Sequence, residues 1–183
     1  MLHTLLSKIH IVVFFQLVIP DFTYQDYILT HSVTFQDGRT LPMKQLKGSP
    51  ETYDVVHFQE KLEALRHSDP LWPVYDRRFH DVIEDQLPVT APIVPIEGNW
   101  LLFQEGLWRK LAGQADYTIF IKAEERALKE RLLQRKMTGG STREEAEAFY
   151  QTGDGVNVRR TLQGSGPADF SMCMEADGSF SLC

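Results

Sequence analysis

The sequence predicts a single α/β domain, residues 1–183, built on a mainly parallel sheet. Two short apolar runs, residues 91–96 and 117–121, have the length and bounding turn residues of buried strands. A short helical stretch through Leu107 and Leu111 separates them, and Gly113 can end it. Strand, helix and strand at this spacing are typical of a βαβ unit with a parallel pair. With 43% hydrophobic and 24% charged residues, the chain has the composition of one ordinary globular domain.

The amino-terminal region contains an apolar run at residues 9–19, which follows Lys8. Its β-branched and aromatic content favours a buried strand. The alternative is a secretory leader, but no small-x-small cleavage site precedes Pro20 and Asp21. The run is too short to be a membrane helix.

A small hairpin and a helix are predicted next. Residues 33–41 alternate around Asp37-Gly38, a strong hairpin signal, and we expect a flap outside the main sheet. Residues 47–53 have loop composition, and Asp54 can cap the following helix. The apolar residues that share one face of this helix are Val55, Phe58, Leu62 and Leu65.

The remaining elements follow from prolines and periodicity. Residues 68–92 are rich in proline and should be mostly extended or loop. A long helix is predicted from Ala123 to Met137, and Ser141 with Glu144 has capping-box spacing for the next one. After a short segment at 157–162, residues 170–174 and 179–182 are predicted to form a terminal β-hairpin through Asp177-Gly178.

Charge and cysteine content exclude several classes. The formal net charge of −6 gives no general nucleic-acid footprint. Cys173 and Cys183 are too few for a disulfide framework or a zinc site by themselves. We therefore expect a cytoplasmic protein whose partners are small molecules, with neither nucleic acid nor membrane among them.

Polar residues end the strand at 91–96. Glu97, Gly98 and Asn99 follow it directly. Ligands of open parallel sheets bind at the carboxyl ends of strands, so Glu97 and Asn99 are candidate site residues. The alternative is a core strand that leaves the interior through a polar turn.

Basic residues gather on the predicted helix at 123–137. Arg131 and Arg135 lie four residues apart on one face, so both can reach one anion. Arginines that neutralise phosphate charge, with a metal held by a carboxylate, are typical of phosphotransferases. A solvated helix face is the alternative.

Four motifs together resemble a known family. They are Lys47-Gly48-Ser49-Pro50-Glu51-Thr52-Tyr53-Asp54, close to KGxPExFD; Pro73-Val74-Tyr75-Asp76-Arg77 with His80-Asp81; Ile96-Glu97-Gly98-Asn99; and Glu130-Arg131-Leu132 leading to Arg135. Over residues 17–175 the chain is similar to the uridine kinase, phosphoribulokinase and pantothenate kinase group of P-loop kinases, above all its bacterial nucleoside- or nucleotide-kinase-like branch. The resemblance implies a three-layer α/β fold and ATP-dependent phosphoryl transfer, with Mg²⁺, to a hydroxyl of a small nucleoside-, sugar- or vitamin-like acceptor.

The resemblance also implies roles for individual residues. Glu97 corresponds to the metal carboxylate, and Arg131 with Arg135 to the lid that closes over the transferred phosphate. Asp21 corresponds to the base toward the acceptor hydroxyl, with Asp26 as the alternative because the usual Asp-Gly-Phe lacks its glycine here. The positions that would line the acceptor site are Lys47, Tyr53, Arg77, His80 and Asn99.

One family motif is missing. No stretch G-x-x-x-x-G-K-[ST], which cradles phosphates, occurs in the sequence, and the nearest glycine and hydroxyl cluster is at 139–142. We expect an amino-terminally incomplete domain without the first strand, phosphate loop and first helix. The alternative function is a non-catalytic remnant that binds a small ligand or a partner chain, since unpaired strand edges would allow a homo-oligomer.

Overall fold

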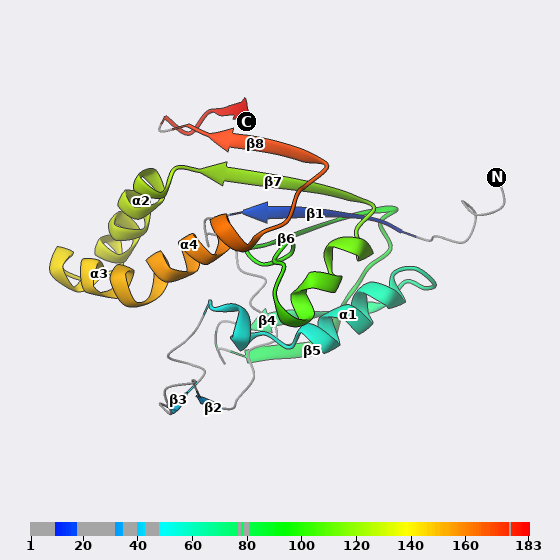
Figure 1. The fold of residues 1–183 in the computed structure, drawn as a ribbon. Helices are drawn as coiled ribbons and strands as arrows, with labels where there is room; N and C mark the ends of the chain where they lie inside the picture. The colour runs from blue at the N-terminus through cyan, green and yellow to red at the C-terminus, as the bar shows by residue number, and fades with distance from the viewer. Residues whose placement is uncertain are drawn as a thin grey trace.

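The structure is a computed structural model, and it describes residues 10–17, 32–34, 40–42, 48–76, 78, 81–175 and 177–183. Its centre is a five-stranded sheet of order β6-β1-β7-β8-β9 (Figure 1). The strands are β1 (Ile11–Leu17), β6 (Ile93–Gly98), β7 (Tyr117–Ala123), β8 (Phe170–Met174) and β9 (Phe180–Leu182). All neighbours are parallel except β8 and β9, which form the predicted terminal hairpin. The predicted three-layer α/β class with a mainly parallel sheet is confirmed.

The central position of the sheet is occupied by β1. This strand pairs in parallel with β6 on one side and β7 on the other, with Phe14 beside both Ile96 and Thr118. Val12 and Phe14 are completely buried, which explains the apolar character of this run. The strands at 91–96 and 117–121 are parallel, as predicted, but β1 lies between them, so they do not pair with each other directly.

Two small antiparallel sheets lie outside the main one. β2 (Ser32–Thr34) pairs with β3 (Thr40–Pro42), as the alternation around Asp37-Gly38 predicted, although that turn lies outside the described residues. β4 (Leu71–Asp76) pairs with β5 (Asp81–Pro88). The proline-rich segment is thus extended as predicted, but its pairing into a hairpin was not foreseen.

In the part of the chain that the structure describes, four α-helices contribute to the core: α1 (Val55–Ala64), α2 (Glu125–Thr138), α3 (Arg143–Phe149) and α4 (Gly155–Gly164). Asp54 caps α1 by accepting the His57 N–H at 3.0 Å, as predicted. The capping box of α3 is one residue later than predicted. Thr142, not Ser141, accepts the Glu145 N–H at 3.2 Å, and the Glu145 carboxylate accepts the Thr142 N–H at 2.8 Å.

The buried side chains form two clusters. One joins β1 and β6 to α1 and to the 3₁₀ turn Gly106–Lys110, and it contains Phe14, Ile96 and Trp100. The other joins β7 to α2, α3 and α4, and it contains Phe120, Leu132 and Val158. The carboxyl end of β6 and the residues after it therefore lie between two packed units, with α2 and α3 beyond the strand tips (Figure 1).

The cysteines are paired. Cys173 of β8 and Cys183 form a disulfide that fastens the terminal hairpin, a pairing that the sequence did not predict. Within the described ranges, no helix is both long and apolar enough to cross a membrane.

Candidate functional site

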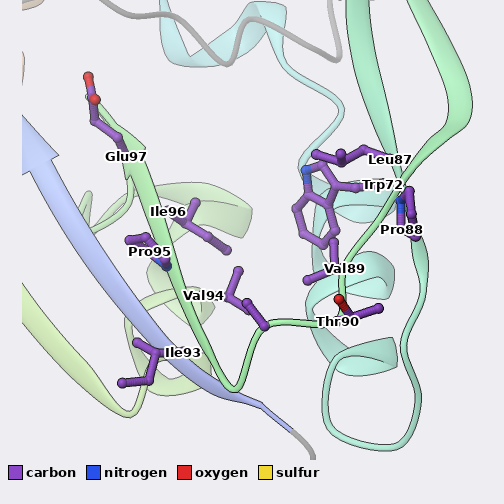
Figure 2. A pocket seen from close by; sticks show the side chains of 11 residues that line it. Trp72, Leu87, Pro88, Val89, Thr90, Ile93, Val94, Pro95, Ile96 and Glu97 are labelled. Atoms are coloured by element: carbon purple, nitrogen blue, oxygen red, sulfur yellow. The ribbon is translucent and has the colours of Figure 1, made fainter.

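Glu97 and Asn99 lie where the carboxyl ends of the central strands meet. Gly98 of β6 is level with Gln16 of β1, and the next residue of β1, Leu17, is level with Ile121 of β7. Glu97 is half-buried at the tip of β6, and its carboxylate points away from the apolar side chains of that strand (Figure 2). Asn99 is also half-buried, in the turn that follows. Both lie at the carboxyl ends of the parallel strands, where open α/β folds bind ligands.

The loop at residues 48–53, called the motif loop here, is fastened to the segment after Glu97 by two tryptophans. The indole N–H of Trp100 donates to the Gly48 carbonyl at 3.0 Å, and that of Trp108 donates to the Pro50 carbonyl at 3.1 Å. Gly48 has φ 95°, a left-handed conformation that favours glycine. Gly48 and Pro50 of the motif loop are thereby held in place by two tryptophans that follow β6.

Tyr53 ends the motif loop. Its ring packs edge-on against Trp108, with the ring centroids 5.5 Å apart and an interplanar angle of 81°. Tyr53 is half-buried, so it can still contact a ligand from one side. Two of the predicted acceptor-lining residues lie in these neighbouring segments. Tyr53 belongs to the motif loop and Asn99 to the turn after Glu97, and the hydrogen bonds of Trp100 and Trp108 join the two.

An ion pair joins the motif loop to α4. Arg160 donates from Nη2 to Glu51 Oε1 at 2.7 Å and from Nη1 to Oε2 at 3.1 Å. Burial would raise the pKa of Glu51, but the hydrogen bonds and the charge of Arg160 outweigh it and hold the pKa below its usual value of 4.5. Glu51 is therefore a carboxylate at neutral pH.

A cavity of about 370 Å³ opens beside this ion pair. Its lining includes Glu51, Tyr53, Trp108, Glu105 and Arg160. Aromatic walls with a few fixed polar groups are typical of small-molecule sites, and the volume is within their usual range of about 300–1,000 Å³. This cavity can accept a small ligand with both apolar and hydroxyl groups.

A second cavity of about 460 Å³ lies between the β4–β5 hairpin and β6 (Figure 2). It is apolar, with Trp72, Val89, Val94 and Ile96 among its lining, and Glu97 lies at one end. In the described part of the chain, β6 is an edge strand of the main sheet. Pro95, which has no N–H, is a residue typical of such an edge.

The arginines of α2 have different environments. Arg131 donates to the Met174 sulfur at 2.8 Å and to the Glu175 carbonyl at 3.2 Å, so its guanidinium contacts the end of β8. Arg135 is exposed, and its charge acts on Asp154. Burial raises the pKa of Asp154, and the attraction of Lys136 and Arg135 only partly offsets this. The predicted role of both arginines at the phosphates stays a prediction.

Five predicted site residues cannot be located: Asp21, Asp26, Lys47, Arg77 and His80 lie outside the described residues. Sequence reasoning also missed four residues that build the site, namely Glu51, Trp100, Trp108 and Arg160. The motif Lys47 to Asp54 contains Glu51 and could have indicated it. Nothing in the sequence indicates Arg160, because its partner is 109 positions away.

Glu97 is suited to one kind of metal. The described ranges contain no group of three or more His, Cys, Asp or Glu side chains that could hold a metal ion. Mg²⁺ is usually bound by one or two carboxylates together with water and substrate phosphates. A carboxylate at a strand tip, such as that of Glu97, has the chemistry of such a ligand.

Comparison with known proteins gives one curated relative and several solved structures. No family model matches the chain. The Escherichia coli K12 protein YggC, described as uncharacterized, is 46% identical over 173 residues, which are 86% of this chain and 73% of YggC. A crystal structure from Silicibacter sp. TM1040, provisionally named a fructose transport system kinase, matches with a TM-score of 0.73 at 24% identity over 88% of this chain and 89% of that one.

A second solved structure is YFH7 from Saccharomyces cerevisiae, provisionally described as a circularly permuted P-loop kinase. It matches with a TM-score of 0.59 at 19% identity, over 71% of this chain and 49% of YFH7. At these identities the two structures show the fold alone, which this chain shares with them.

Proposed function

This chain belongs to the family of E. coli YggC, and on that premise we propose that it transfers a phosphoryl group from ATP to a hydroxyl of a small acceptor. The carrying observation is the position of Glu97. It lies at the carboxyl end of β6 in a P-loop kinase fold, beside a kinase-like loop that Trp100 holds in place. In phosphoryl transfer the protein mainly positions groups and neutralises charge, and the strand-end carboxylate together with the arginines of α2 would supply both.

Each predicted residue has a role in this proposal. Glu97 would hold Mg²⁺, which when bound neutralises charge on the phosphates. Arg131 and Arg135 would approach the transferred phosphoryl group. Asp21, or alternatively Asp26, would accept the proton of the acceptor hydroxyl. The acceptor itself would contact Lys47, Tyr53, Arg77, His80 and Asn99.

The acceptor is a nucleoside-, sugar- or vitamin-like molecule. The name of the Silicibacter protein supports a sugar, and the mixed aromatic and charged lining of the cavity beside Tyr53 and Glu51 suits a hydroxylated molecule of any of these classes. D-Fructose, uridine and pantothenate therefore form a suitable test panel.

A second candidate function is ligand binding without turnover. It is supported by the residues that follow the central strand. P-loop enzymes carry G-x-x-x-x-G-K-[ST] after a strand, whereas here β1 is followed by Val18-Ile19-Pro20, and the sequence has no such motif anywhere. Losing the donors of a phosphate cradle removes much of the electrostatic stabilisation in the site, because one preorganised donor alone can contribute about 10²–10³ in rate.

One experiment separates the two candidates: calorimetric titration of the purified chain with Mg·ATP, next to E. coli YggC, followed by phosphoryl-transfer assays on the three-acceptor panel. Binding and turnover by this chain would establish the kinase. Acceptor binding by this chain, with Mg·ATP binding and turnover only by YggC, would establish the second candidate. Absence of both activities from YggC as well would refute the kinase proposal for the family.

A further inference from the structure

We propose that Arg160 is a positioning residue, which holds the motif loop in place against the turn that follows Glu97. The proposal deepens the proposed function, since it rests on the motif loop being part of the acceptor site. Arg160 lies on α4, which belongs to neither segment, so the ion pair links a third element to the site.

The contact with the loop is suited to positioning because it is bidentate. Two nitrogens of Arg160 meet both carboxylate oxygens of Glu51, at 2.7 and 3.1 Å. A guanidinium fork on a carboxylate fixes orientation as well as distance, which a lysine cannot do. Arg160 is 31% exposed and Glu51 43% exposed, so water screens the pair and its main effect should be on geometry rather than on global stability.

Two aromatic rings also lie close to the guanidinium. Its central carbon lies 5.7 Å from the centroid of Trp100 and 5.4 Å from that of Phe103. Trp100 in turn donates its indole N–H to Gly48 at the start of the motif loop. Arg160 therefore contacts the loop at Glu51 and, through Trp100, acts on the same loop at Gly48.

The helix that carries Arg160 also packs against the arginine helix. Val158 of α4 belongs to the same buried cluster as Leu128, Leu132 and Leu133 of α2. The helix that carries Arg160 is therefore itself fixed by packing against α2.

Hydrogen–deuterium exchange on the whole chain tests the positioning directly and needs no ligand. The variants are Arg160→Ala and Arg160→Lys, and the matched control is Arg159→Ala, which removes the neighbouring arginine and its exposed 3.0 Å pair with Glu125. We expect exchange at residues 48–53 to be about 10-fold faster in R160A and about 3-fold faster in R160K, with R159A unchanged. Unchanged exchange at residues 48–53 in R160A would overturn the proposal. If R160A does not fold, R160K is measured instead, and unchanged exchange at residues 48–53 in R160K would also overturn the proposal.

A kinetic arm separates positioning from a general structural effect. With D-fructose, uridine and pantothenate as probes, R160K should raise KM for whichever acceptor is turned over by about 10-fold while KM for ATP stays within about 2-fold. A rise in KM for ATP alone would overturn the proposal. If no acceptor is phosphorylated, the kinase proposal fails, while the exchange result still decides whether Arg160 positions the loop.

Discussion

Trp100 donates its indole N–H to the carbonyl oxygen of Gly48 at 3.0 Å, across 52 positions of sequence. Trp100 itself is 1% exposed and Gly48 is half-buried, so the donor is held in the core while its acceptor lies nearer the surface. The bond joins the turn after the proposed metal carboxylate to the first residue of the motif loop.

Trp100→Phe should test this contact. The variant keeps an aromatic ring but leaves the Gly48 carbonyl without its donor, so we expect a loss of about 1–3 kcal/mol in the free energy of unfolding. Urea denaturation followed by circular dichroism measures it. Tyr117→Phe, at a 43% exposed position, is the control and should change stability by less than about 0.5 kcal/mol. A W100F variant as stable as this control would show that the bond contributes nothing.

Features that depend on residues close together in the sequence could be predicted, and contacts between distant residues could not. Local signals identified the Asp54 cap, the long helix at 125–138 and the terminal hairpin, because each depends on residues within a few positions. They failed where the partner is distant. Strand periodicity cannot tell that β1 inserts between β6 and β7, and it cannot pair Arg160 with Glu51. Family resemblance indicated Glu97 and Tyr53, but the indole donors that hold their surroundings became visible only in three dimensions.

The ion pair between Arg66 and Asp116 should stabilise the start of the sheet. Asp116 Oδ2 accepts from Arg66 Nη1 at 2.6 Å and also from the Val12 N–H at 2.9 Å, and the two side chains are only 15% and 17% exposed. Asp116→Ala leaves the β1 amide without its acceptor and the Arg66 guanidinium with the Gln114 carbonyl but no carboxylate, so we expect a loss of about 3 kcal/mol. Chemical denaturation measures the loss.

The exposed pair of Arg159 with Glu125 serves as the comparison for this prediction. Glu125→Ala removes one partner at a site where the side chains are 42% and 46% exposed, and it should cost no more than about 1 kcal/mol. Equal losses in D116A and E125A would contradict the assignment of a special role to Asp116.

Glu97→Gln tests the proposed metal carboxylate. The amide keeps the shape of the side chain but removes the charge that would hold Mg²⁺, so turnover with Mg·ATP should fall by about 10²-fold or more while the melting temperature stays within about 2 °C. Steady-state kinetics over a Mg²⁺ series and thermal melting give the two values. Glu144→Gln, in the exposed first turn of α3, is the control and should leave turnover unchanged. Full Mg²⁺-dependent activity in E97Q would remove Glu97 from the site.

The Glu51–Arg160 pair, although screened by water, should give the protein a small acid-sensitive contribution to stability. The folded-state pKa of Glu51 is lowered below its usual 4.5, so the unfolded chain binds the proton more readily than the folded one. The stabilisation is therefore complete above about pH 5 and is lost as the pH falls from 4.5 through the folded-state pKa. Denaturation curves between pH 7 and pH 3 should show a smaller loss for Glu51→Gln than for the parent chain. The pKa of Asp169 is also lowered in the folded state, by hydrogen bonds that its carboxylate accepts from Thr118. Asp169→Asn should therefore also lose less stability than the parent chain as the pH falls, and it serves as a second, independent variant. Parallel pH profiles for the parent chain and E51Q would show that Glu51 titrates alike in the folded and unfolded states, and the lowered pKa attributed to Arg160 would then be wrong.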